Sequence, residues 1–274
     1  YDRTFDGGTN VIHVVQFTNG SDIFVARISK DGSRLLGSTF LGGSQNDGLN
    51  PPFGDLTKNY GDELRGDIIT DSENNIYISS VTTSDNFRAI KGRDVTYNRG
   101  DTDAILMKLK PDLSGIVWGT FLGGDGSDAS HTLKLDKNNG IFLAGGTTSA
   151  NFPVKQISYQ STHKGDADGW IAHVGSEGDT IYNATYTGTD AFDQVYFIDV
   201  NAAEEIYVYG QTSGNFPVTP GVYSNPNSGH FVQKFNADLT EIIFSTVFGS
   251  GRGVPDISPT AFLVNECNNL YLSE

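Results

Sequence analysis

The chain contains one cysteine, Cys267, and one methionine among its 274 residues. A single cysteine excludes an intrachain disulfide framework and any zinc site built from several cysteines. No apolar run approaches the roughly 18–20 residues that a membrane-spanning helix requires, so we expect no transmembrane segment. No segment has the apolar spacing of an amphipathic helix either. These absences exclude helical bundles, helical membrane proteins and small disulfide-stapled folds.

Basic residues are also scarce, with 18 Lys and Arg against 33 Asp and Glu, and the formal net charge is −15. A field of that sign repels phosphate backbones, so no nucleic-acid partner is expected. The 33 glycines and the 29 Phe and Tyr residues (17 plus 12) favour many short strands joined by tight turns. The first residues, Tyr1 to Thr4, do not resemble a signal peptide. The chain is therefore either cytosolic or a mature or trimmed piece of a longer chain, and the repeats described next favour the second interpretation.

Three series of residues recur along the chain at a nearly constant spacing. A Thr-Ser-x-Asn-Phe segment recurs around Asn86, Asn151 and Asn215, in steps of 65 and 64 residues. A short polar residue precedes an apolar run by five positions in steps of 65, 65, 65 and 64, at Asp6, Asp71, Asp136, Asn201 and Asn265. A Thr-Phe-Leu-Gly-Gly type segment contains Thr39, Thr120, Thr185 and Thr246, and its first step is longer because 16 extra residues lie within Gly48–Gly66. Such a period predicts a repeat architecture, with the insertion as a loop on one face.

Each repeat contains four strand-like runs with two-residue apolar alternation, which is typical of a propeller blade. The sequence therefore predicts an all-β fold, a β-propeller of four-stranded antiparallel blades. About four blades are visible, and one strand of a preceding unit spans Asp6 to Phe17. The whole chain, 1–274, forms a single region divided into units at about 6–19 (partial), 20–99, 100–164, 165–226 and 227–274. The array is expected to be part of a larger propeller in a longer chain, with a closed four-bladed ring as the alternative.

The motifs resemble a known family. Asp-Ala-Ile-Leu-x-Lys-Leu at 103–109, Thr-Phe-Leu-Gly-Gly at 120–124 and Thr-Ser-x-Asn-Phe-Pro at 148–153 resemble the SBBP-type β-propeller repeat, over residues 6–274. The runs at 22–28 and 258–269 further resemble large, gliding-motility-associated surface proteins of Bacteroidota. The resemblance implies export by the type 9 secretion system, whose machinery would then be a partner. It also implies an extracellular or cell-surface location and a role as an adhesin. The sorting domain of such proteins is not in this chain.

Two acidic clusters, Asp125–Asp128 and Asp166–Asp168, are the candidate calcium sites, with Asp125, Asp128, Asp166 and Asp168 as ligands. They lack the EF-hand pattern, and no other cofactor is predicted. Two repeated acidic series are interpreted as structural, accepting backbone N–H groups at strand entries and in turns. They comprise Asp22, Asp103 and Asp168, and then Asp71, Asp136, Asn201 and Asn265. The five histidines lack metal-site spacing, and the aromatics Trp118, Trp170 and Tyr196 are expected to pack between sheets.

Two functions remain open at this point. The preferred one is a non-enzymatic scaffold or adhesin whose irregular loops bind a surface protein or polysaccharide. These loops are Gly48–Gly66, Asp85–Thr102, Ala150–Ala167 and Gly214–Ser228. The alternative is a propeller-type carbohydrate-active enzyme, a glycosidase or lyase, which would need non-repeated carboxylates from different blades to converge. No catalytic residue can be named from the sequence.

Overall fold

The computed structural model describes residues 10–12, 15–17, 20–52, 54–59 and 61–273. Within these ranges the chain forms eighteen strands and one short 3₁₀ helix, η1 (Asp62–Leu64). No helix in these ranges is long and apolar enough to cross a membrane. The prediction of an all-β fold is therefore confirmed.

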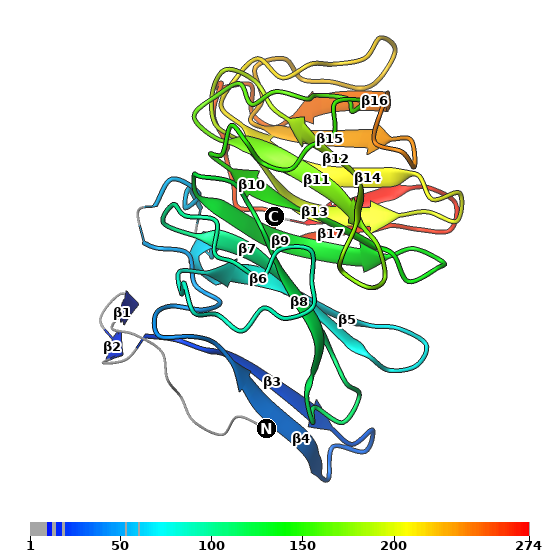
Figure 1. Cartoon of the computed structure of the whole chain (residues 1–274). Coiled ribbons are helices and arrows are strands. Elements are labelled where there is room, and N and C mark those ends of the chain that lie inside the picture. Colours follow the sequence, from blue (N-terminus) through cyan, green and yellow to red (C-terminus); the bar gives the residue numbers. More distant parts are fainter. Residues whose placement is uncertain (1–9, 13–14, 18–19, 53, 60, 274) are drawn as a thin grey trace.

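Three complete four-stranded antiparallel sheets form the body of the molecule. Sheet I comprises β5 (Asp67–Thr70), β6 (Ile76–Thr82), β7 (Asp103–Leu109) and β8 (Ile116–Leu122). Sheet II comprises β9 (Asp128–Leu135), β10 (Ile141–Thr147), β11 (Asp168–Val174) and β12 (Ile181–Thr187). Sheet III comprises β13 (Asp193–Val200), β14 (Ile206–Thr212), β15 (His230–Phe235) and β16 (Ile242–Phe248). Figure 1 shows the three sheets stacked face to face, in chain order.

The sheets are offset by two strands from the units read in the sequence. Strands β6 and β7 pair along their whole length, from Ile76 opposite Leu109 to Thr82 opposite Asp103. The long linker between them, placed at the end of a sequence unit, therefore lies within one sheet. The short Gly-Gly loop after β8 makes the crossing to the next sheet instead. A repeat period defines the length of a unit but leaves its starting strand open, which is why the sequence could not fix this grouping.

Two half-sheets lie at the ends of this array. The N-terminal half-sheet pairs β3 (Ile23–Ile28) with β4 (Leu35–Leu41), and the C-terminal half-sheet pairs β17 (Ala261–Val264) with β18 (Leu270–Ser273). The strand predicted across Asp6 to Phe17 is instead two short strands, β1 (Asn10–Ile12) and β2 (Val15–Phe17), which pair with each other. Residues 1–9, 13 and 14 lie outside the described ranges.

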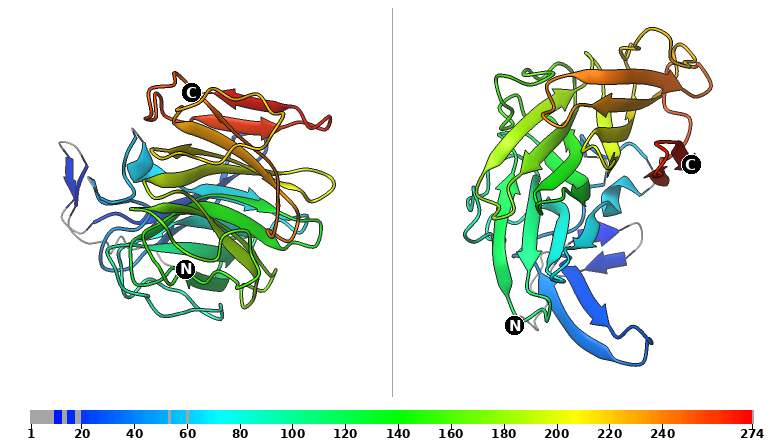
Figure 2. Two further views of the ribbon diagram at one scale, coloured as in Figure 1. Left: turned by 90° about the horizontal axis from the view of Figure 1, so that it is seen from above. Right: turned by 90° about the vertical axis from the view of Figure 1, so that its right-hand side faces the viewer.

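The first strands of successive sheets contact one another, β5 with β9, β9 with β13 and β13 with β17. The sheets consequently follow one another around an arc, which the right-hand view of Figure 2 shows from the blue N-terminal half-sheet to the red C-terminal strands. Among the described residues the two half-sheets are not paired with each other.

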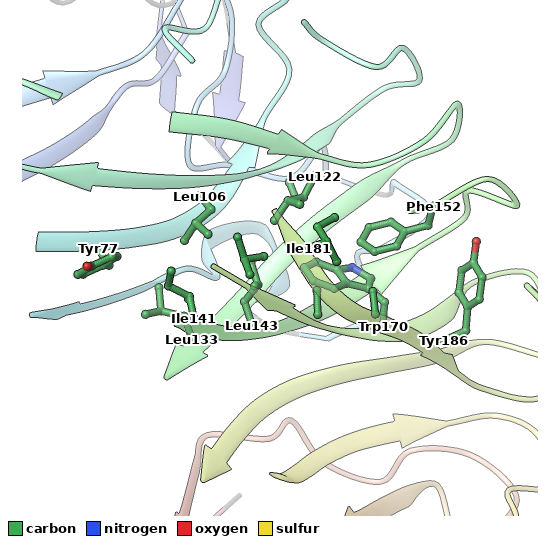
Figure 3. Close-up of a cluster of buried hydrophobic side chains, with 14 of the residues drawn as sticks. Tyr77, Leu106, Leu122, Leu133, Ile141, Leu143, Phe152, Trp170, Ile181 and Tyr186 are labelled. Atoms are coloured by element: carbon green, nitrogen blue, oxygen red, sulfur yellow. The ribbon is translucent and has the colours of Figure 1, made fainter. Parts of the chain in front are cut away.

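Apolar side chains fill the space between neighbouring sheets. Tyr77 and Leu106 of sheet I pack with Leu133 and Leu143 of sheet II in the largest cluster, drawn in Figure 3. Trp118, Trp170 and Tyr196 are each at most 2% exposed, which confirms the prediction that these aromatics are packing residues.

The linkers inside the sheets lie along the outermost strands. The N–H of Gly119 in β8 donates to the carbonyl of Ile90 at 2.8 Å, and the N–H of Tyr186 in β12 donates to that of Gln160 at 3.0 Å. In sheet III the N–H of Thr219 donates to the carbonyl of Ser245 in β16. The linkers, which were predicted to be displayed loops, thus form hydrogen bonds with the backbone of each outer strand. Without them those backbone groups would be open to pairing with another chain.

Candidate functional site

The repeated Thr-Ser-x-Asn segment holds the loop through which the chain enters the segment's own sheet. In sheet II the Ser149 hydroxyl donates to Asp128 Oδ2 at 2.7 Å and accepts the Gly126 N–H at 2.8 Å. Asn151 Oδ1 accepts the Asp125 N–H at 2.8 Å. Ser84 and Asn86 make the equivalent bonds in sheet I. In sheets I and II these residues are therefore structural, whereas in sheet III Thr189 of the loop itself bonds the equivalent acid, Asp193.

Two buried carboxylates lie beside Gly123, in the loop between sheets I and II. A Cβ added to Gly123 would lie 2.6 Å from both Asp103 Oδ1 and Asp128 Oδ2, so only glycine lets the two carboxylates approach this closely. Asp103 Oδ2 accepts the Asn98 N–H at 2.6 Å, as predicted for a strand-entry acid, whereas Oδ1 has no hydrogen-bond partner among the described residues. Burial, with the nearby negative charge of Asp128, raises the pKa of Asp103 to about 8.

Each of the two predicted calcium clusters pairs an exposed carboxylate with a buried one. Asp125 and Asp166 are exposed, whereas Asp128 and Asp168 are buried. Asp128 is bonded through both oxygens, to Thr147, Ser149 and the Gly124 N–H. In the described part of the chain no three His, Cys, Asp or Glu side chains converge as a metal site would require. Calcium binding at these residues stays a prediction.

The second repeated polar series caps a turn in every sheet. Asp136 Oδ1 accepts the N–H groups of Asn138 and Gly140, each at 2.7 Å, and Asn201 Oδ1 accepts those of Ala203 and Glu205, each at 3.0 Å. Asp71 and Asn265 repeat the same pattern. The interpretation of these residues as turn residues is confirmed.

The insertion at 48–66 packs inward against the first strands, so the prediction of a loop displayed on one face is wrong. Leu49, Leu56 and Asp62 are at most 4% exposed. The segment folds inward because Asp62 gathers the backbone N–H groups of Lys58 and Asn59 on its Oδ2, at 2.9 and 2.7 Å.

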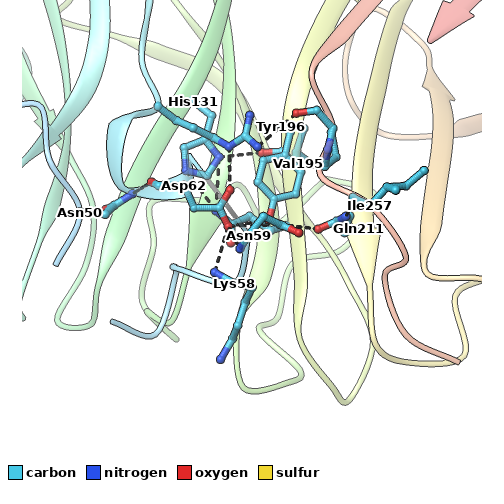
Figure 4. A network of polar contacts seen from close by, with 12 residues as sticks. Asn50, Lys58, Asn59, Asp62, His131, Val195, Tyr196, Gln211 and Ile257 are labelled. Atoms are coloured by element: carbon cyan, nitrogen blue, oxygen red, sulfur yellow. Dashed lines mark hydrogen bonds and ion pairs between the residues drawn. The ribbon is translucent and has the colours of Figure 1, made fainter. Parts of the chain in front are cut away.

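A polar network joins the insertion to sheets II and III (Figure 4). Arg65 Nε lies 2.8 Å from Asp62 Oδ1, and the Arg65 guanidinium stacks on the Tyr196 ring at 4.3 Å. An Arg65 terminal nitrogen also donates to the carbonyl of Pro259 at 3.2 Å, just before β17. Asn59 Nδ2 donates to the Tyr196 hydroxyl at 2.8 Å. The network therefore ties the inserted segment to sheet III and to the backbone just before β17.

His131 completes this network as a neutral ring. It stacks on Tyr196, with ring centroids 5.5 Å apart and an interplanar angle of 9°. Burial, together with the nearby Arg65 charge, lowers the pKa of His131 to about 4. Nδ1 lies 3.0 Å from the Val195 carbonyl and Nε2 lies 3.0 Å from Gln194 Nε2. The tautomer that fits carries its proton on Nδ1, donates to Val195 and accepts from Gln194.

A polar pocket of about 320 Å³ opens among the hairpin turns at one end of sheets II and III. His173 lies at its wall, stacked on Phe142 with centroids 3.9 Å apart and in edge contact with Tyr182 at 5.1 Å. His173 Nε2 lies 2.8 Å from Asp136 Oδ2. Tyr182 is 58% exposed, so its side chain lies partly open at the pocket.

Carboxyl groups from two further turns complete this pocket, Glu204 and Asp238. Glu204 Oε2 lies 2.7 Å from Lys137 Nζ, and Oε1 has no hydrogen-bond partner among the residues described. The pocket thus combines an exposed ring with several hydrogen-bond acceptors.

The pocket is also a place where the chain departs from its own repeat. In sheets I and III the position of His173 is lysine, and the Lys108 and Lys234 ammonium groups each lie 5.1 Å from the ring of a tyrosine, Tyr77 or Tyr207. The sequence analysis gave His173 no role beyond the absence of metal-site spacing. The substitution of lysine by histidine at an aligned repeat position was the signal that could have drawn attention to it. His13, in the N-terminal segment, lies outside the described residues.

No protein-family model matches this chain, and no curated protein matches it significantly either.

Proposed function

We propose that this chain is part of a β-propeller in an extracellular or cell-surface protein, and that it binds a polysaccharide without acting on it. The observation that carries the proposal is the open pocket bounded by Tyr182, His173 and Asp136. The residue at the pocket wall, His173, differs from the lysine at the same position of sheets I and III. The recurring acids, in contrast, hold loops in place. Binding sites are concave and combine apolar rings with a few placed polar groups.

The propeller interpretation is supported by the stacked four-stranded sheets, whose first strands lie side by side. Blades of a propeller are four-stranded antiparallel sheets arranged around a common centre. The inserted segment occupies the side of the first strands where a central site would be found, and its carboxylate, Asp62, is paired with Arg65. This arrangement favours a scaffold over an enzyme with a central active site.

The chemistry of the pocket favours a sugar ligand. The exposed face of Tyr182 can cover the apolar C–H side of a sugar ring, while carboxylate and amide oxygens accept hydrogen bonds from its hydroxyl groups. Asp136, Asn138, Glu204 and Asp238 supply such groups at the pocket wall. A net charge of −15 favours neutral or cationic polysaccharides over anionic ones.

The proposed location rests on the resemblance of the repeats to SBBP-type propellers of gliding Bacteroidota. It implies export by the type 9 secretion system and an adhesive role at the cell surface. The expected result is that the protein on intact cells is accessible to an antibody and to an added protease. A strictly internal protein in such cells would contradict this part of the proposal.

A glycan array followed by calorimetry tests the binding. We expect at least one neutral polysaccharide to bind, and the Tyr182→Ala variant to bind it at least about tenfold more weakly. The matched control is Tyr223→Ala, because Tyr223 is 77% exposed and lies outside the pocket. Absence of any glycan ligand, or equal losses in both variants, would contradict the proposal. Cleavage of the bound glycan would favour the carbohydrate-active enzyme instead.

A further inference from the structure

A small polar cavity of about 10 Å³ lies between the insertion at 48–66 and the crossing from sheet I to sheet II. A cavity of this size holds one ion or one water molecule. The insertion lines it with Asn50 and residues 54–57, the linker before β7 with Asp101 and Thr102, and the crossing loop with Ser127. Three segments that are far apart in the sequence therefore meet around one small space.

Asn50 brings an interior acceptor without a protein donor to this cavity. The side chain is buried, with 2% of Asn50 exposed, and its Nδ2 donates to the Asp62 carbonyl at 2.9 Å (Figure 4). A carbonyl only accepts hydrogen bonds, so this contact fixes which end of the amide is the oxygen. Oδ1 has no hydrogen-bond partner among the described residues. An interior acceptor without a partner is costly, so a ligand at this oxygen stabilises the fold.

Thr102 brings a second interior oxygen of the same kind. It is 2% exposed, and its Oγ1 has no hydrogen-bond partner within the described ranges. The repeat does not require this hydroxyl. At the next crossing, from sheet II to sheet III, the residues equivalent to Thr102 and Ser127 are Ala167 and Phe192, which pack together in an apolar cluster. The polar pair at the first crossing therefore has a cause other than the crossing itself.

The charges around the cavity favour a cation. Asp55 and Asp101 line it and are exposed, and none of the described residues that line it is basic. The Thr57 hydroxyl donates to the Pro51 carbonyl at 2.7 Å, which leaves the lone pairs of its oxygen available. The lining thus offers two carboxylates, one amide oxygen and three hydroxyl groups. Calcium takes six to eight oxygen ligands of these kinds.

We propose that this cavity binds one calcium ion, which joins the insertion to the crossing between sheets I and II. Asn50 Oδ1 and Thr102 Oγ1 are the interior ligands, and the carboxylates of Asp55 and Asp101 balance the charge of the ion. Calcium is favoured over magnesium, because magnesium requires near-ideal octahedral geometry and these oxygens come from three separate segments. The proposal does not depend on polysaccharide binding.

This site differs from the two acidic clusters predicted from the sequence. Neither Asp125 nor Asp128 is among the residues that line the cavity. It also differs from a site built on three acidic or imidazole side chains, which the described residues do not form. Because only two of its ligands are carboxylates, we expect the dissociation constant of an extracellular calcium module, about 10⁻⁴–10⁻³ M. The net charge of −15 supports cation binding of this strength.

Thermal unfolding of the full chain, after removal of metal ions with a chelator, tests the binding. Calcium chloride at about 5 mM, above the expected dissociation constant, should raise the melting temperature by about 2–5 °C relative to sodium chloride of equal ionic strength. No difference between the two salts would overturn the proposal. An equal rise with magnesium chloride would overturn it as well.

Substitutions at the cavity and beside it locate the ion. We expect Asp55→Asn and Asp101→Asn each to weaken calcium binding at least about tenfold in calorimetry, and both change exposed positions, so folding should persist. Thr102→Val removes an interior ligand and should also weaken binding. The matched control is Asp125→Asn, because Asp125 is exposed in the adjacent loop and does not line the cavity. A loss in Asp125→Asn with none in Asp101→Asn would overturn the proposal.

Limited proteolysis tests whether the ion holds the insertion. Lys58 is exposed and directly follows Thr57 at the cavity. Calcium should slow tryptic cleavage after Lys58 at least about threefold, because it opposes local opening of the segment. Cleavage after Lys155, which is exposed in the linker of sheet II away from the cavity, should not change. Equal protection of both sites, or protection of Lys58 that persists in Asp101→Asn, would overturn the proposal.

Discussion

At the scale of residues, each buried acid of the repeat accepts a backbone hydrogen bond, but its burial disfavours the charged form of the carboxyl group. Asp103 accepts one backbone N–H but leaves its other oxygen beside Asp128, in a place that water does not reach. Desolvation favours the protonated acid, which is why the pKa of Asp103 is raised to about 8.

The pH dependence of stability follows from that shift. The pKa of Asp103 rises from 3.8 to about 8 on folding, so its contribution to stability is complete below pH 4 and is lost as the pH rises through 8. The Asp103→Asn variant, which is neutral at every pH, should therefore melt at a higher temperature than the parent at pH 8.5 and at nearly the same temperature at pH 4.5. Thermal unfolding followed by circular dichroism at the two pH values measures this.

Asp125→Asn is the control for that experiment, because Asp125 is exposed in the same loop region. We expect it to change the melting temperature little at either pH. A parent protein whose stability does not fall between pH 5 and 8.5, or an Asp103→Asn variant that is less stable at both, would contradict the assignment.

Single residues were predictable from the sequence where their role is local. The polar series at Asp71 and Asp136 caps turns as expected, because an Asp followed within three positions by Asn defines a turn within a few residues. The roles of His131 and His173 were not predictable. Each depends on rings from other strands, Tyr196 and Phe142, and a spacing along the chain does not show which rings meet.

At the scale of elements, the hydrogen bonds of the Thr-Ser-x-Asn segment hold the crossing between sheets. Ser149 both donates to Asp128 and accepts from the Gly126 backbone. Removing its hydroxyl leaves the Gly126 N–H without its partner and takes one of the two hydrogen bonds from the buried Asp128 Oδ2, which keeps the Gly124 N–H.

We expect Ser149→Ala to lower the free energy of unfolding by about 1–3 kcal/mol, as for other buried hydrogen-bonded groups. Urea denaturation measures the change. Ser161→Ala, at an exposed position in the following linker, should stay within about 0.5 kcal/mol of the parent. If the two variants lose the same free energy of unfolding, the Ser149 hydroxyl does not stabilise the loop as its hydrogen bonds indicate.

The four-strand repeat was predictable at this scale because alternation and turn residues are local signals. The pairing of the strands was not. The long linker between β6 and β7 looks like a boundary in the sequence, whereas in the fold it leaves the inner part of the sheet, runs along β8 and returns. Only the backbone pairing distinguishes the two groupings.

At the scale of the whole molecule, the insertion at 48–66 connects parts of the fold that are far apart in the sequence. Arg65 contacts Asp62 in its own segment, Tyr196 in sheet III and the backbone before β17. The extra residues were evident in the sequence as a break in the period. Their inward position was not, since Pro and Gly residues around 51–54 indicate a turn in any location.

Loss of the Arg65 contacts should destabilise the folded chain as a whole. We expect Arg65→Met to lower the free energy of unfolding by about 3–5 kcal/mol, because it leaves the Asp62 carboxylate buried without its counter-ion. The double variant Asp62→Asn/Arg65→Met should recover part of that loss. Urea denaturation measures both.

Lys137→Met, which removes an exposed ion pair with Glu204, is the control and should cost less than about 1 kcal/mol. If the double variant is as unstable as the sum of the two single variants, then Asp62 and Arg65 do not act as a pair.

The linkers that run along β8, β12 and β16 have a consequence for how such a molecule changes over generations. Each sheet brings its own cover for its flank, so adding or deleting a segment of about 65 residues, the observed period, alters the number of sheets without exposing a new lateral edge. We therefore expect duplication of a whole repeat to be tolerated, because each added sheet would carry its own linker along its outer strand.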